Sequence, residues 1–360
     1  MQDRNNKRLG RTTRRAVLGA LGLLLWTLPG HAAEPAYTTG PATTLPSSNT
    51  GWDYITLDQA TGRLFIARRA DGLTVWDTKA GKVLATMENS IGANGVVLVP
   101  EFGRGYTAMT DGTMLAFDLA TLKPIERVKL DEGDLNQGFY DPATKRVHMV
   151  VGNHPARTTW ISLDAATGKV LGRTEFDSKK MDDPAPDGRG TLYAPMRDNN
   201  AMLKLSSSDL KVQATWKLGD CVQPVAVEFD HAANRVLVAC RGDKPVFIAL
   251  DPADGRVTIT LPIGRGVDGM AHDEGRHLLV TANGVDGTMS VIRQDGPDKY
   301  SLVETVATRS MARVIAMDAA SGRLFTVTAG YSQPATGPDG KLPALVFHKD
   351  SFAVMSYTRP

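Results

Sequence analysis

Acidic and amide residues recur along this chain in one local setting, beside a glycine or just before a short apolar segment. The recurring positions are Asp53, Asn94, Asn136, Asp182 or Asp183, Gln223 and Asp268, followed by a cation, Arg313. Carboxylate and amide oxygens are the ligands of hard cations such as Ca²⁺, which takes six to eight of them. If Asn136, Asp183 and Asp268 converge, they would hold such an ion, which would polarise a carbonyl group and activate water.

Other residues would recognise a ligand rather than transform it. Trp52 directly precedes Asp53 and would stack on a bound ring. Four cations would attract an anion: Arg241, Lys244, Arg265 and Arg313. Acidic residues stand among these cations, so a solvated surface of mixed charge is the alternative. The sequence contains no Gly-x-Ser-x-Gly nucleophile motif and no Cys-x-x-Cys-His haem motif.

Turns that mostly begin with aspartate divide the chain into repeating units. One series begins at residues 58, 100, 141, 187, 230, 273 and 318, and members read DQATG, DPATK and DAASG. Successive starts differ by 42, 41, 46, 43, 43 and 45 residues, and a second series lies about half a period later. Asp accepts hydrogen bonds from nearby backbone amides, and Gly or Asn adopts the left-handed backbone. Each unit therefore reads as strand, turn, strand, loop, strand, turn, strand.

Short β-branched segments between these turns predict the fold. Segments such as 63–67 (RLFIA) and 235–239 (RVLVA) are typical of strands buried between neighbouring sheets. Four-stranded units at this period close radially, which protects their strand edges. The sequence therefore predicts an all-β, seven-bladed β-propeller of four-stranded antiparallel blades over residues 51–360. Residues 34–50 would be a linker or a strand that closes the ring, with 351–358 as the outer strand of the last blade.

This architecture gives the recurring polar residues a common place. The first strand of each propeller blade lines the central channel, and its start faces one mouth. The sequence therefore predicts a ring of acids and amides there. Residues 331–343 enlarge the last blade and are rich in Pro and Gly. Insertions on a rigid scaffold commonly carry recognition, so we expect a loop that arches over one face and binds a partner.

The two cysteines, Cys221 and Cys240, are predicted to form a disulfide. They flank two strands that run antiparallel about a turn at 230–234, so the start of one strand lies beside the end of the other. A disulfide needs Cα atoms about 4.4–6.8 Å apart, which this pairing supplies. The spacing is not Cys-x-x-Cys, which disfavours a redox-active pair.

The strand–turn–strand pattern, with RLFIA at 63–67 and DPADG at 251–255, resembles that of the YVTN-repeat (YncE-like) bacterial propellers. The stretch 221–224 (CVQP) followed by 235–240 (RVLVAC) is similar to a blade of several members. The resemblance covers roughly residues 50–360, although Tyr-Val-Thr-Asn itself is missing and VTAN at 280–283 is nearest. It implies a seven-bladed extracytoplasmic domain, and ligand or nucleic-acid binding is proposed for some members.

The N-terminus reads as a signal peptide over residues 1–33, cleaved near residue 32 or 33. A basic region precedes an apolar run at 16–28, which is too short for the roughly 20 residues of a membrane span. The stretch 13–18 (TRRAVL) resembles a twin-arginine signal, with Sec export as the alternative. Without this segment, 35 basic and 38 acidic residues leave a net charge near −3. The predicted protein is periplasmic, and its charge argues against a nucleic-acid partner.

Three classes of function stay open. The favoured one is a non-enzymatic scaffold that binds a small ligand or a periplasmic protein at the channel mouth, as a monomer without a membrane span or a cofactor. The second is a metal-dependent, lactonase-like hydrolase that uses Ca²⁺ or another divalent cation. The third is an accessory subunit of a periplasmic oxidoreductase. The sequence does not choose among them.

Overall fold

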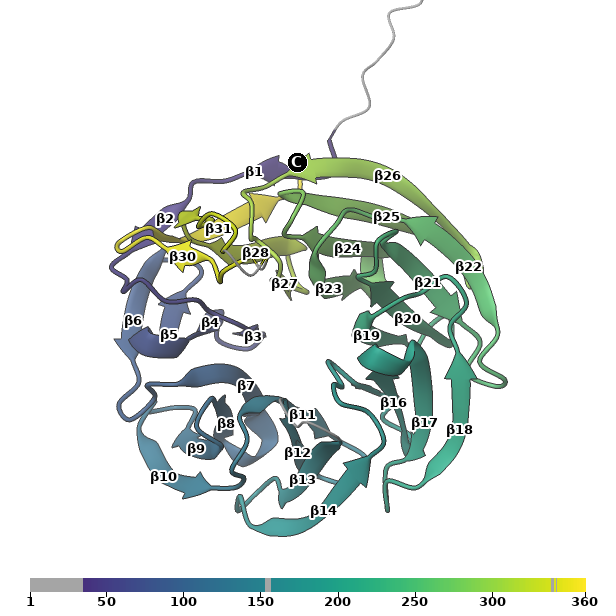
Figure 1. Ribbon diagram of the computed structural model, residues 1–360, viewed down its shortest axis with the longest axis horizontal. Coiled ribbons are helices and arrows are strands. Elements are labelled where there is room, and N and C mark those ends of the chain that lie inside the picture. The colour runs from purple at the N-terminus through teal and green to yellow at the C-terminus, as the bar shows by residue number, and fades with distance from the viewer. Residues whose placement is uncertain (1–34, 153–156, 338–339, 341) are drawn as a thin grey trace, which may run out of the picture. The chain divides into compact units, whose positions relative to one another are not determined.

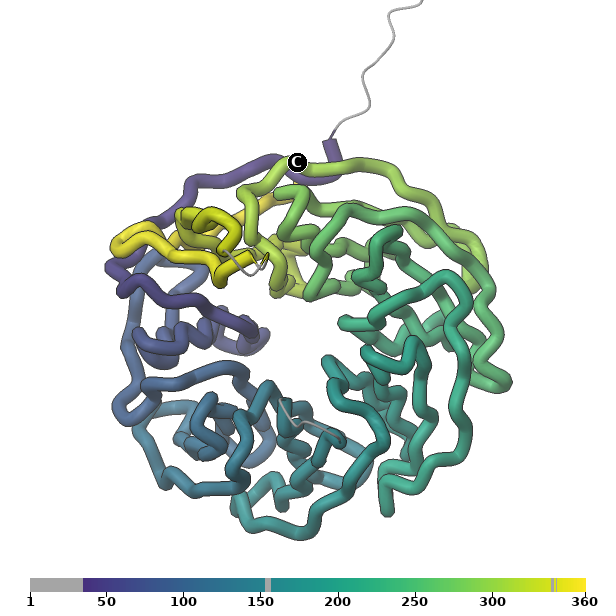
Figure 2. The backbone as a smooth tube through the Cα atoms, viewed as in Figure 1, coloured from purple at the N-terminus to yellow at the C-terminus, as the bar shows by residue number. Residues whose placement is uncertain are grey.

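The computed structural model describes residues 35–152, 157–337, 340 and 342–360. The predicted signal peptide, residues 1–33, lies outside the described residues. Within the described part, the unit from Pro35 to Pro360 is almost entirely β-structure, and its sheets are arranged radially around one axis (Figures 1 and 2). No helix among these residues is long and apolar enough to cross a membrane.

Six sheets have four antiparallel strands each, in chain order from the channel outward. Blade 1 comprises β3 (Ile55–Asp58), β4 (Arg63–Arg68), β5 (Gly72–Asp77) and β6 (Lys82–Thr86). Blade 2 comprises β7 (Ala93–Val99), β8 (Arg104–Met109), β9 (Thr113–Asp118) and β10 (Pro124–Lys129). Blade 3 comprises β11 (Leu135–Asp141), β12 (Arg146–Val151), β13 (Thr158–Asp164) and β14 (Val170–Phe176).

The next three blades repeat this order. Blade 4 comprises β15 (Ala185–Pro186), β16 (Thr191–Met196), β17 (Ala201–Ser206) and β18 (Val212–Lys217). Blade 5 comprises β19 (Pro224–Asp230), β20 (Arg235–Cys240), β21 (Val246–Leu250) and β22 (Val257–Pro262). Blade 6 comprises β23 (Val267–Asp273), β24 (Leu278–Asn283), β25 (Thr288–Gly296) and β26 (Lys299–Ala307). The described residues also include four single-turn 3₁₀ helices: η1 (Arg69–Asp71), η2 (Pro100–Phe102), η3 (Arg197–Asn199) and η4 (Glu274–Arg276).

Blade 7 joins the two ends of the described chain. Its strands are β27 (Ile315–Asp318), β28 (Arg323–Thr328), β31 (Phe352–Thr358) and, outermost, β1 (Thr38–Thr39) with β2 (Thr43–Leu45). The N-terminal strands pair antiparallel with β31, beside which they lie in Figure 1. Segment 351–358, which was expected to form the outer strand, therefore forms the third strand of this blade, β31. The ring is closed by hydrogen bonds between segments about 300 residues apart in sequence.

The aspartates that begin the turns have a repeated local role. Asp58 accepts hydrogen bonds from the amide of Ala60 at 3.1 Å and the hydroxyl of Thr61 at 2.6 Å. Asp141 and Asp318 accept the corresponding pair of hydrogen bonds in blades 3 and 7. Such side-chain contacts mimic a backbone turn and return the chain antiparallel. The turn motif and the seven-bladed fold predicted from it are confirmed.

The hydrophobic core is divided among the interfaces between blades. Within the described residues, seven apolar clusters each join two neighbouring blades, including one between blade 7 and blade 1. Phe65 of blade 1 and Phe117 of blade 2, for example, pack with ring centroids 5.7 Å apart. Because both faces of most inner and middle strands are covered, these strands are apolar in runs rather than in strict alternation.

The predicted disulfide is present. Cys221 precedes β19 and Cys240 ends β20, and their Cα atoms are 5.2 Å apart across the two strands. Both residues are fully buried in the core between blades 4 and 5. The bond joins the start of an inner strand to the end of the next one, directly before Arg241.

Candidate functional site at the channel mouth

The central channel opens into a mouth basin of about 590 Å³. Its wall consists of residues near the starts of the inner strands and residues that follow the second strands. The structure brings five of the polar positions predicted from sequence around this space: Asp53, Asn136, Asp182, Asp268 and Arg313. A sixth, Asp183, lines the next compartment of the channel.

A chain of ion pairs crosses four adjacent blades at the basin. The Asp268 carboxylate accepts from Arg313 at 2.9 Å and lies 3.2 Å from Arg241. Arg313 also lies 3.7 Å from Asp53, whose second carboxylate oxygen pairs with Arg69 at 2.8 Å. Each carboxylate therefore contacts two guanidinium groups. Because two arginines share one aspartate, their side chains are held in defined orientations although the arginines outnumber the aspartates.

A second cluster lies on the opposite side of the basin. Asp182 accepts from Arg197 at 3.1 Å and lies 3.7 Å from the ammonium group of Lys180. The amide of Asn136 faces the same carboxylate at 3.4 Å. Among the described residues that line the basin, five lysines and arginines therefore meet three aspartates. The basin has a surplus of two positive charges.

Three of these arginines occupy one position in the repeat. Arg69, Arg197 and Arg241 each directly follow the second strand of their blade, after β4, β16 and β20. The sequence analysis missed Arg69 and Arg197 and named Arg241 only within a basic patch. An alignment of the second strands would have found them, because the end of the second strand lies beside the start of the inner strand in an antiparallel pair. The other two members of that patch lie elsewhere: Arg265 pairs with Asp286 at 2.7 Å, and Lys244 is exposed and does not line the basin.

Trp52 does not offer its ring to a ligand, contrary to the prediction. The side chain is 1% exposed and packs against Phe347 and Phe352 at centroid distances of 5.0 and 5.4 Å. The guanidinium group of Arg313 lies 5.4 Å above the Trp52 ring and donates a 2.8 Å hydrogen bond to its carbonyl oxygen. Trp52 is therefore a packing residue that also supports Arg313 from below.

Two further predicted positions do not line the basin. Asn94 is 1% exposed, and its amide donates to the carbonyl of Asn136 at 2.7 Å while its oxygen accepts from Arg69 at 2.9 Å. It therefore links blades and positions Arg69. Gln223 is exposed, lines neither compartment of the channel and has a left-handed backbone with φ of 54°.

The insertion in blade 7 contributes an apolar lip. Its ends form a hairpin of β29 (Tyr331–Ser332) and β30 (Val346–Phe347). Ala344, Leu345 and Phe347 line the basin, so the contribution comes from residues just after the predicted segment 331–343. Phe347 also packs on Trp52, which anchors the lip to the core.

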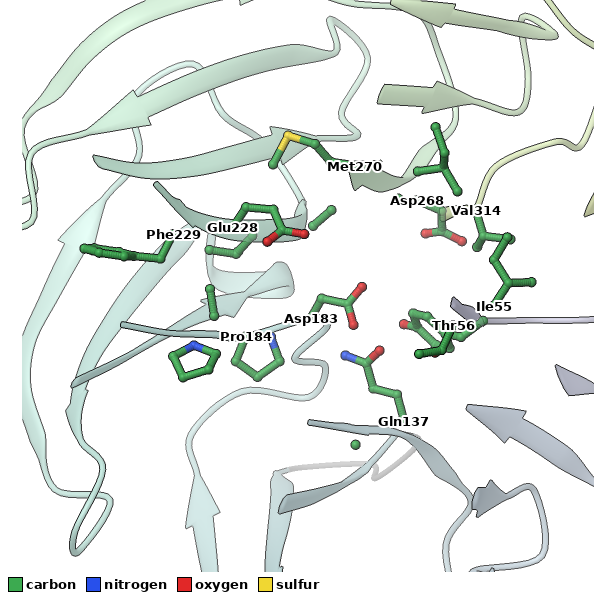
Figure 3. A pocket seen from close by; sticks show the side chains of 18 of the residues that line it. Ile55, Thr56, Gln137, Asp183, Pro184, Glu228, Phe229, Asp268, Met270 and Val314 are labelled. Carbon is green, nitrogen blue, oxygen red and sulfur yellow. The ribbon is translucent and has the colours of Figure 1, made fainter. Parts of the chain in front are cut away.

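Below the basin lies an inner chamber of about 400 Å³. Tyr54 and Asp268 line both compartments, so the two adjoin each other. Figure 3 shows the carboxylates of Asp183, Glu228 and Asp268 directed into this chamber, together with the amide of Gln137. Glu228 was missed by the sequence analysis because it stands in the middle of β19 rather than at its start.

Burial perturbs the carboxyl groups of the chamber. It raises the pKa of Glu228 to about 7. Burial also raises the pKa of Asp183 well above its usual value, and the neighbouring charge of Asp182 raises it further. Perturbed acids that face a cleft mark candidate functional sites.

The three predicted metal ligands do not gather around one point. Both oxygens of Asp268 contact arginines, and the amide nitrogen of Asn136 donates to Tyr54 and Asp182. Asp183 lies in the inner chamber. Within the part of the chain that the structure describes, no group of three His, Cys, Asp or Glu side chains is arranged to hold a metal ion.

Comparisons with known proteins identify the fold alone. No protein-family model matches the chain, and no curated protein matches its sequence significantly. Among solved structures, the chain is similar to Kuenenia stuttgartiensis hydrazine synthase, with a TM-score of 0.66 and 13% identity over 85% of this chain and 98% of that one. It is also similar to a chain of a mitotic checkpoint complex, with a TM-score of 0.70 and 12% identity over 94% of this chain and 100% of that one.

Proposed function

We propose that this propeller is a binding protein whose mouth basin takes a small anionic ligand. The observation that carries this proposal is the surplus of positive charge, with five cationic side chains against three carboxylates around a basin of about 590 Å³. That volume lies within the range of small-molecule sites, roughly 300–1,000 Å³.

The ion pairs prepare the arginines for such a ligand. Arg197 and Arg241 hold their orientation through single contacts with Asp182 and Asp268, which leaves other N–H donors of each guanidinium group for a carboxylate or phosphate. A charge-assisted hydrogen bond is roughly twice as strong as a neutral one. The lip at Ala344–Phe347 would cover the apolar part of the ligand.

Charge-neutral variants of two arginines test the basin. The double variant Arg197→Gln/Arg241→Gln removes two cations, yet Asp182 keeps Lys180 and Asp268 keeps Arg313. Binding of unbranched carboxylates of three to six carbons, and of inorganic phosphate, would be measured by ligand-observed NMR at low salt. We expect the double variant to bind at least tenfold more weakly than the wild type.

The matched control is Arg293→Gln, because Arg293 also pairs with one aspartate, Asp295, but does not line the basin. This control should bind as the wild type does. Affinity that is equal in the double variant and the control would overturn the proposal, and so would an absence of binding by every anion in the set.

We also propose that the chain is exported and related to the YVTN-repeat propellers. The buried disulfide Cys221–Cys240 supports export, because disulfides persist in oxidising compartments. Fractionation of cells that express the full chain, followed by N-terminal sequencing, tests this. Cleavage near residue 32 or 33 in the periplasmic fraction is the expected result, and an uncleaved cytoplasmic protein would contradict it.

A further inference from the structure

Two carboxyl groups of the inner chamber face it without a cation. Within the described residues, Asp183 and Glu228 form no ion pair, and no lysine or arginine lines the chamber, where His231 is the one basic side chain. Both side chains are half-buried at the wall of the channel. Partial burial disfavours a carboxylate without a charged partner, so a proton or a cation from outside the chain would stabilise each of these groups.

A third side chain of the chamber is also incompletely satisfied. Gln137 is 3% exposed and directs its amide toward Asp183 in the chamber (Figure 3). This amide lowers the pKa of Asp183, but its Nε2 atom is buried and reaches no acceptor with normal hydrogen-bond geometry. Buried polar groups in native proteins are nearly always hydrogen-bonded. An amide without a well-formed hydrogen bond, beside two acids without a cationic partner, therefore marks a place prepared for a polar ligand.

The balance of acidic and basic side chains reverses along the channel axis. The basin has more cations than acids, whereas the adjoining chamber combines acids with an amide, and Asp268 lies where the two meet. A ligand with one anionic and one cationic end would match both compartments. An ammonium group has three donors, which suits acceptors on Asp183, Glu228 and the reoriented amide of Gln137.

We propose that the inner chamber binds the cationic end of the ligand whose anionic end lies in the mouth basin. The ligand class is a small zwitterion with separated charges, such as an ω-amino acid. This inference rests on the proposed function of the basin and specifies the ligand that the basin and the chamber take together.

Three matched families of compounds test this without any change to the protein. They are unbranched ω-amino acids of three to six carbons, the carboxylates of equal length and the amines of equal length. Affinities for the full chain would be measured by ligand-observed NMR at pH 7. We expect at least one amino acid to bind tenfold or more tightly than both its carboxylate and its amine.

Protein variants then locate the cationic end. The isosteric double variant Asp183→Asn/Glu228→Gln should bring the amino acid down to the affinity of the carboxylate and should not weaken carboxylate binding. The single variant Glu228→Gln should lose part of the difference in affinity between the amino acid and the carboxylate. It replaces the double variant in the test if the double variant does not fold. The matched control Glu88→Gln replaces an exposed glutamate outside the channel.

The outcomes separate the two proposals. If carboxylates and amino acids bind equally, the chamber proposal is overturned and the proposed function of the basin stands. If amines bind as tightly as amino acids, the two-ended ligand is overturned, and the basin proposal fails as well when the carboxylates of equal length do not bind. If no compound binds, both proposals fail.

Discussion

Replacing Glu228 by glutamine should stabilise the protein at alkaline pH and leave its stability unchanged in acid. Burial raises the pKa of Glu228 from its ordinary 4.5 to about 7. The folded protein therefore keeps the Glu228 proton up to about pH 7, while the unfolded chain loses it near pH 4.5. Because the unfolded state releases this proton first, the free energy of unfolding falls between these two pH values and the loss is complete above pH 7.

The size of the effect follows from the two pKa values. A difference of one pKa unit corresponds to about 1.4 kcal/mol, so the ionised side chain costs the folded state about 3 kcal/mol at pH 8. This is an upper value, because the side chain is half-buried at the wall of the channel. Glutamine has nearly the same shape and no charge at any pH. The Glu228→Gln variant should therefore gain about 2–3 kcal/mol at pH 8 and nothing at pH 4.

Urea unfolding followed by tryptophan fluorescence at pH 4, 5.5 and 8 measures this, with no reducing agent so that the disulfide stays intact. The control Glu88→Gln removes one negative charge at an exposed position and should change the free energy of unfolding by less than about 0.5 kcal/mol. If Glu228→Gln gains no more than this control at pH 8, the carboxylate is stabilised in the folded state and the argument from burial is refuted.

Three other perturbations test the rest of the fold. Replacement of Cys221 and Cys240 by alanine should lower the free energy of unfolding by about 3 kcal/mol, because the bond closes a loop with a sequence separation of 19; an effect below about 1 kcal/mol in urea unfolding would contradict this. Burial lowers the pKa of His148 to about 4, so the folded state resists its protonation and stability should fall by about 2 kcal/mol from pH 7.5 to 5. The variant His148→Gln should remove this loss of stability, whereas His231→Gln, at an exposed position, should keep it. Equal pH profiles of stability in the two variants would contradict the role of His148. Deletion of residues 35–45 should lower the midpoint of thermal unfolding by several degrees and increase aggregation, since it exposes the edge of β31, and an unchanged midpoint in calorimetry would argue against closure by these strands.

The sequence predicted the architecture because the signals that determine it are local and repeated. Asp58, Asp141 and Asp318 each stabilise their own turn within three residues, and the spacing of such turns sets the blade length. The pairing of Cys221 with Cys240 followed from the same register. Its placement required no knowledge of how the blades are arranged around the ring.

The chemistry of the channel needed the closed ring. Arg313, Asp268 and Arg241 belong to three different blades, and their contacts arise only when those blades are arranged around one axis. The same closure enclosed Glu228 within the chamber and buried Trp52 under Phe347. Burial and long-range charge pairing depend on neighbours distant in the chain, so they leave no periodic pattern along it.

The sequence alone therefore determined a seven-bladed propeller, its disulfide and polar residues at the starts of the inner strands. Only the tertiary structure decided which of those residues meet. Gln223 and Trp52 stand near the starts of inner strands, as Asp53 and Asp268 do, yet Gln223 does not line the channel and Trp52 is buried in the core. It also decided the balance of acidic and basic side chains in each compartment of the channel. That balance is a sum over side chains from several blades, which no single repeat contains.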